Sequence, residues 1–287
     1  VRGKAEHIVP VFGYQLLLLT KLLSSHPPLF IIITHYYHTR RQVMIMEYSN
    51  YGMAQLRSSG PVVLYRPNPS KQLLLYDMAT SSSVLTFLKM HRYTVNIKNQ
   101  TNTEFMSENG RLPVVIAEGS DKPMCGFKEV FRYVSRACNY VPSLLELAYM
   151  DWIETKFLEA EMYVCWCYEP ILNDYTKNRY TFDLPWPISS FLYRRKRQEI
   201  QMSLGKRFND FTDFLEKFNK FLDQLNKLIG NRPFCSNELS PSAINALIYG
   251  HANAILSTSI HPKLVEAIKW HKRIENFVQR IEVHYPS

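Results

Sequence analysis

A run of apolar residues between positions 243 and 256 restricts the fold of this chain more than any other segment. A helix that is apolar on every side must be covered by other elements on every side. We therefore expect a buried helix here, at the centre of a mostly helical body. His251 lies in the same run, and a single histidine in such a place is expected to be a hydrogen-bonded core residue and not a metal ligand or a base.

Helices that can cover this run are predicted throughout the chain after the break at Val141-Pro142. Apolar residues recur there at spacings of three and four, as in helices with one buried stripe. The second stripe also fits heptad spacing, but we expect a bundle and not a coiled coil. The three stripes are Ile153, Phe157, Ala160, Val164 and Cys167; Phe208, Phe211, Leu215, Phe218, Leu222, Leu225 and Ile229; and Ala267, Trp270, Ile274, Phe277 and Ile281.

A proline-rich segment, DLPWP at 183–187, interrupts these helices. Each proline removes a backbone donor and restrains the residue before it. We expect a fixed turn with an anchored Trp186.

Residues 61–140 show a different order of elements. A strand is predicted at 72–76, then a helix at 81–90 that Thr80 or Ser81 caps, a strand at 93–97 and an irregular polar stretch at 99–110. Strands at 112–116 and 121–124 and a helix at 127–137 follow. The order β, α, β, loop, β, β, α is typical of a thioredoxin-like domain.

Three residues have expected structural roles. Pro113 opens the third strand, where the thioredoxin-like fold usually has a cis proline; the strand order alone leaves an ordinary trans proline equally open. Ser242 and Asn245 approximate a capping box at the start of the buried helix. Asn245 can accept the backbone hydrogen bond, but without a charge it does not interact with the helix dipole.

The formal net charge is +9, which favours acidic partners or anionic lipid. A basic run, Arg194, Arg195, Lys196 and Arg197, contributes part of this excess. No aromatic-interleaved basic stripe accompanies the run, so a solvated helix face is expected and nucleic acid is not an expected partner. The run and the nearby Trp186 are candidate contacts for a protein or a lipid, and the sequence does not rank the two.

The five cysteines are too few and too irregularly spaced for a disulfide framework, which favours a reducing compartment. Cys165 and Cys167 lie two residues apart, so on a helix they point to nearly opposite sides. No second pair completes a tetrahedral site. We expect neither a metal nor a cofactor.

Residues 1–60 are expected to be an irregular extension or a mispredicted start, since they begin with Val1. Lys21 and the pair Pro27-Pro28 divide their apolar segments into pieces shorter than the roughly 20 residues of a membrane span. The predicted organisation is therefore this extension, a thioredoxin-like domain at 61–140 and an all-helical domain at 141–287.

Several short strings resemble those of the metaxin family, whose members have a glutathione-transferase-like architecture. Each string is too short to be specific, but together and in this order they cover about residues 61–285. The strings are TEFMS (103–107), GRLP (110–113), AEMY (160–163), WC (166–167), LPWP (184–187), ALIYGH (246–251) and RIEVHY (280–285).

The resemblance implies an α+β, glutathione-transferase-like fold and a non-catalytic subunit of the sorting and assembly machinery of the mitochondrial outer membrane. Such a subunit would support protein import and β-barrel insertion from the cytosolic face, as a peripheral membrane protein. Its implied partners are a metaxin-1-like tail-anchored protein, the core β-barrel assembly protein and precursor proteins. The chain stops soon after the last predicted helix without an apolar tail, so attachment is expected to run through a partner.

The alternative is a cytosolic glutathione-transferase-like enzyme. Such an enzyme needs a donor near the end of its first strand, for which Ser81 or a neighbour in residues 77–83 is a candidate, although capping is the expected role of such a serine. Transferases also usually place an acidic or amide residue and a serine after the fourth strand. Cys125, Gly126 and Phe127 stand there instead, and only the backbone N–H of Gly126 remains as a donor. We therefore expect no catalysis.

Overall fold

The computed structural model describes residues 61–120, 122–204, 206–230, 234–235 and 242–286. The extension expected at residues 1–60 lies outside them. The described chain begins with a four-stranded sheet in the order β2-β1-β3-β4. Strand β1 (Val62–Arg66) pairs in parallel with β2 (Val95–Asn99) and antiparallel with β3 (Val114–Ala117). Strand β4 (Met124–Cys125) pairs antiparallel with β3 at the edge.

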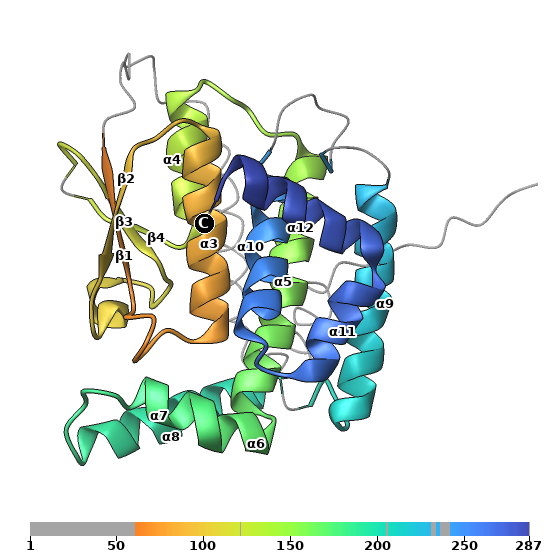
Figure 1. The fold of residues 1–287 in the computed structure, drawn as a ribbon. Coiled ribbons are helices and arrows are strands. Elements are labelled where there is room, and N and C mark those ends of the chain that lie inside the picture. Colours follow the sequence, from red (N-terminus) through yellow and green to blue (C-terminus); the bar gives the residue numbers. More distant parts are fainter. Residues whose placement is uncertain (1–60, 121, 205, 231–233, 236–241, 287) are drawn as a thin grey trace, which may run out of the picture. The chain divides into compact units, whose positions relative to one another are not determined.

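Two helices, α3 (Leu75–Met90) and α4 (Phe127–Ala137), cover one face of this sheet (Figure 1). A short 3-10 helix, η1 (Thr103–Met106), connects β2 to β3. Helix α4 has the predicted bounds, because Val130, Phe131 and Val134 are all buried on one side. The order of strands and helices is the predicted thioredoxin-like one.

The first strand was predicted in the wrong place. Residues 72–74 do not form a strand: the Asn68 carbonyl accepts hydrogen bonds from the N–H groups of Gln72 and Leu73, and α3 begins at Leu75. The three leucines at 73–75 are buried, but they lie in a turn and at the start of a helix. A short aliphatic run was therefore not sufficient evidence for a strand. Thr80 and Ser81 consequently lie inside α3 and do not cap it.

The second half is helical, as predicted. Its central helix α10 (Ala243–Thr258) is buried along most of its length. The other helices are α5 (Leu144–Trp166), α6 (Glu169–Ile171), the π-helical turn η2 (Leu172–Thr176), α7 (Lys177–Tyr180), α8 (Ile188–Leu204), α9 (Phe211–Ile229), α11 (Pro262–Trp270) and α12 (Lys272–His284).

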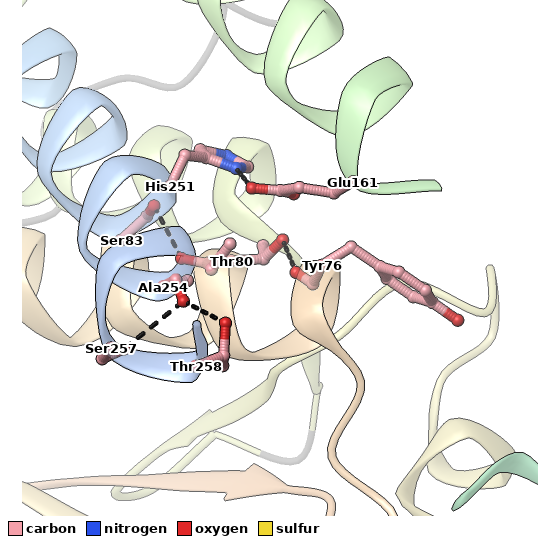
Figure 2. A network of polar contacts seen from close by, with 9 residues as sticks. Tyr76, Thr80, Ser83, Glu161, His251, Ala254, Ser257 and Thr258 are labelled. Atoms are coloured by element: carbon pink, nitrogen blue, oxygen red, sulfur yellow. Dashed lines mark hydrogen bonds and ion pairs between the residues drawn. The ribbon is translucent and has the colours of Figure 1, made fainter. Parts of the chain in front are cut away.

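Helix α10 packs most extensively against α3 and so joins the helical half to the sheet half (Figure 1). The close approach depends on Gly250, because a Cβ there would lie 2.1 Å from Ser83 Oγ and 2.4 Å from Ser83 N. The next residue, His251, is fully buried, and its Nδ1 lies 2.8 Å from Glu161 Oε1 of α5 (Figure 2). His251 is thus the expected hydrogen-bonded core residue.

The last predicted stripe contains an error at Trp270. The chain breaks between α11 and α12 at His271, whose backbone angles are not helical. Ala267, Ile274, Phe277 and Ile281 face inward, whereas Trp270 is 84% exposed. One continuous helix was predicted, and the break moves Trp270 out of the stripe.

The described residues belong to one compact unit. The domain boundary expected between residues 140 and 141 therefore stays a prediction. It falls in the connection between α4 and α5. No helix within the described ranges is both long enough and apolar enough to cross a membrane.

Candidate functional site

A cavity of about 250 Å³ lies where a transferase-like site would be expected, at the start of α4. Residues of α3, the segment before β3, α5 and α8 line it. Its charged groups include Asp77, Glu104 and Lys196. Lys196 Nζ lies 3.7 Å from Glu104 Oε1, so the two partly neutralise each other. Burial raises the pKa of Asp77 well above its ordinary value, Glu104 adds to this rise, and Lys196 opposes it.

The glycine after β4 does not offer its backbone donor to a ligand. The N–H of Gly126 donates to the Pro113 carbonyl at 2.9 Å, so the donor that remained in the sequence is already used. The Phe127 side chain is buried and packs against Phe87, with ring centroids 5.4 Å apart. A Cβ on Gly126 would lie 3.2 Å from Arg111 Cβ, and its φ of +79° favours glycine.

Among the candidate hydroxyl groups at Ser81 and its neighbours, Thr80 lines the cavity, but its hydroxyl already donates to the Tyr76 carbonyl at 2.8 Å. Ser81 is buried within α3 and does not line the cavity. After the true first strand, the Ser70 hydroxyl donates to Asn68 Oδ1 at 2.8 Å, and neither residue lines the cavity. Neither Ser81 nor Ser70 is therefore placed at this cavity, and the Thr80 hydroxyl is already bonded within α3.

Cys165 and Cys167 are not activated thiols. Burial raises the pKa of the Cys165 thiol to about 12 and also raises that of Cys167. Within the described ranges, no group of three or more histidine, cysteine, aspartate or glutamate side chains is placed to hold a metal ion.

The structure divides the basic run of α8 into two pairs. Lys196 faces Glu104, and Arg197 pairs with Glu169. Arg194 and Arg195 are exposed. The run is therefore not a single solvated face, and only its first half is presented outward.

Trp186 is not anchored, contrary to the expectation from the DLPWP segment. Its side chain is 83% exposed, and Ile188 and Phe191 nearby are 51% and 65% exposed. Phe191 precedes Arg194 and Arg195 by three and four residues, so these three share a face of α8. We call Trp186, Ile188, Phe191, Arg194 and Arg195 together the α8 surface.

Ile188 and Phe191 were not among the contacts predicted from the sequence. They lie seven and four residues before Arg195, and this helical spacing was the available signal.

The three residues with expected structural roles are placed as follows. The Leu112-Pro113 peptide bond is cis. Ser242 precedes α10, but its side chain accepts no capping hydrogen bond from the backbone. Asn245 donates to Ser242 Oγ at 3.0 Å and accepts from the N–H of Cys235 at 2.8 Å, so it ties the preceding loop to α10.

The chain was compared with known protein families and structures. Residues 81–197 match the Tom37 family, described as outer mitochondrial membrane transport complex protein. The chain is 30% identical to metaxin-2 of Mus musculus over 233 residues and 28% identical to metaxin-2 of Homo sapiens over 235 residues, each match covering 77% of this chain and 88% of the relative. A glutathione S-transferase structure from Sinorhizobium meliloti 1021 aligns with a TM-score of 0.50 and 13% identity, over 78% of this chain and 88% of that chain.

The fold is therefore the α+β fold of glutathione transferases, and the predicted class is confirmed. The sequence comparisons define the class further, as an outer mitochondrial membrane transport complex protein. Within that class, the chain belongs to the metaxin-2 family.

Proposed function

We propose that this chain is a non-catalytic subunit of the sorting and assembly machinery of the mitochondrial outer membrane, and that it acts through protein contacts. The observation that carries the proposal is the α8 surface. Helix α8 buries only Ile200 and Leu204 of its side chains, while Ile188 and Phe191 face outward. Neighbouring exposed apolar side chains of this size mark interaction sites.

The α8 surface has the composition of an interface anchor. Aromatic residues and arginine are enriched among the residues that dominate binding energy, and both occur here. Complete burial of an apolar side chain such as Phe191 contributes roughly 1.5–3 kcal/mol. Arg194 and Arg195 can then pair with carboxylates at the edge of the same contact.

The proposed partners are a metaxin-1-like tail-anchored protein, the core β-barrel assembly protein and precursor proteins. The chain would be held at the cytosolic face of the outer membrane by these contacts and would support import and β-barrel insertion. Membership of a transport-complex family supports this placement.

The geometry of the cavity supports the absence of catalysis, because the Gly126 N–H and the Thr80 hydroxyl already donate to backbone carbonyls and Ser81 lies outside the cavity. We expect the purified protein, incubated with glutathione and an electrophile, to give no turnover above the uncatalysed reaction. Turnover at transferase-like rates would contradict the proposal and favour the enzyme alternative.

Affinity isolation from solubilised mitochondria tests the role of the α8 surface. The double variant Trp186→Ser/Phe191→Ser should lose most of the captured partners without a change in melting temperature, because both side chains are exposed. Trp270→Ser is the matched control, since Trp270 is equally exposed on α11. Equal capture by the double variant and the control would reject the proposed surface.

Salt-sensitive binding to protein-free anionic vesicles, lost in the double variant, would instead assign the surface to lipid.

A further inference from the structure

A second open groove lies between α5 and α9, with a volume of about 330 Å³. It shares no residue with the α8 surface, and a ligand could bind to it whether or not the proposed function is correct. Its apolar lining is aromatic: Phe218 and Phe221 of α9 are buried, and Trp152 of α5 lies edge-on to Phe221 with ring centroids 5.1 Å apart. Figure 1 shows the two helices that form its walls.

The rim of the groove is cationic on several sides. Lys156 projects from α5, Arg207 from the connection before α9, and Lys217 and Lys220 from α9. Glu159 is the only carboxylate that lines the groove among the described residues. Four cations and one carboxylate leave the rim with an excess of positive charge.

The existing ion pairs leave part of this charge available. Glu159 pairs with both Lys156, at 3.0 Å, and Arg207. Lys217 pairs with Asp213 at 2.8 Å. No ion pair is described for Lys220 with any residue placed in the structure, and its side chain is exposed. One carboxylate shared by two cations does not fully balance either, so incoming carboxylates would be attracted to both walls.

We infer that this groove binds an acidic amphipathic segment of a partner protein. An apolar side chain of the segment would enter the aromatic lining, and glutamates or aspartates on either side of it would pair with Lys220 on one wall and with Lys156 and Arg207 on the other. The distribution of the cations favours a peptide, because a phospholipid brings its negative charge at one end only. The volume lies at the lower end of the range of about 300–1,000 Å³ for ligand pockets, which suits one or two inserted side chains.

Binding of a designed peptide to the full chain tests the inference. The probe is a short dye-labelled peptide with glutamates on both sides of a Leu-Phe pair. Fluorescence anisotropy should show saturable, salt-sensitive binding, and Lys220→Glu should weaken it about tenfold by replacing attraction with repulsion. Lys227→Glu is the matched control, since Lys227 is exposed on the same helix but does not line the groove, and it should change the affinity less than about twofold.

A second measurement locates the peptide. A version with bromophenylalanine should quench tryptophan emission, and Trp152→Phe should remove that quenching while the other three tryptophans remain. A peptide with lysines in place of the glutamates should not bind. The inference is wrong if the acidic peptide does not bind, if Lys220→Glu and Lys227→Glu weaken binding equally, or if only anionic phospholipid vesicles bind in a Lys220-dependent manner.

Discussion

Among single residues, Asp77 makes the pH dependence of stability testable. Burial, reinforced by Glu104, raises its pKa in the folded protein above the ordinary value of 3.8. Between these two pKa values, Asp77 therefore keeps its proton in the folded state, whereas the unfolded chain has released it. The contribution of Asp77 to stability is complete below about pH 3.8 and falls as the pH rises through the folded pKa.

Asp77→Asn removes this loss of stability, because asparagine does not titrate. The variant should gain stability relative to the native protein as the pH rises from about 4 to 7, which urea unfolding at several pH values can measure. Asp174→Asn is the control, because Asp174 is exposed. A difference between Asp77→Asn and the native protein that does not change with pH would contradict the assigned pKa direction.

The five cysteines should differ sharply in reactivity. Cys138 is exposed, Cys167 is half-buried, and Cys125, Cys165 and Cys235 are buried. Since the thiolate is the reactive form, the raised pKa of Cys165 and Cys167 slows both further. Titration of the native protein with a thiol reagent should give one fast equivalent, and Cys138→Ser should abolish it. A fast phase that survives this substitution would mean that another thiol is exposed.

At the scale of elements, the contact between α3 and α10 depends on the absence of a side chain at Gly250. Gly250→Ala improves the helix propensity by about 1 kcal/mol. The added Cβ, however, meets the Ser83 backbone N at 2.4 Å and the Ala79 carbonyl oxygen at 2.7 Å, and neither atom can rotate away. Overpacking of this kind costs about 3 kcal/mol. The variant should therefore lose about 2 kcal/mol of unfolding free energy.

Chemical denaturation checks this value against Ser257→Ala, an exposed change on the same helix that should alter stability by less than about 0.5 kcal/mol. A Gly250→Ala variant as stable as this control would show that the two helices can separate at no cost.

The sequence predicted elements that have a strong apolar period or a long continuous apolar run, and it failed where burial arose in another way. Helix α4 and the buried α10 have clear apolar patterns, and both were found. The leucines at 73–75 form an apolar run of the kind found in buried strands, but here a turn and the start of a helix bury them. This burial depends on tertiary packing, which the period of a sequence does not reveal. The exposure of Trp186 and Trp270 was missed for the same reason, since composition alone does not show which aromatic residues the core covers.

The candidate cavity was only partly predictable. The sequence showed that no acidic or amide side chain follows β4, but the bond from Gly126 to the Pro113 carbonyl depends on how the loops meet in space. The pairing of Glu161 with His251 joins residues 90 positions apart, so the sequence could not indicate it.

At the scale of the whole molecule, the α8 surface implies how the chain is held at the outer membrane. Contacts through Phe191, Arg194 and Arg195 would be peripheral. Alkaline carbonate weakens peripheral contacts in general because lysines on either partner, with an ordinary pKa near 10.4, lose their charge and tyrosines, near 10, gain one at that pH, although Arg194 and Arg195 stay charged. A membrane-inserted helix is insensitive to this change, because its apolar burial does not depend on charge.

We therefore expect alkaline carbonate to release this chain from isolated mitochondria and to leave a tail-anchored partner in the pellet. The double variant Trp186→Ser/Phe191→Ser should reach the soluble fraction without carbonate, whereas Trp270→Ser should fractionate like the native chain. Immunoblots of the two fractions measure both outcomes. If the native chain resisted carbonate in cells that lack the tail-anchored partner, attachment through protein contacts would be wrong, because peripheral contacts with any remaining partner would be released at that pH.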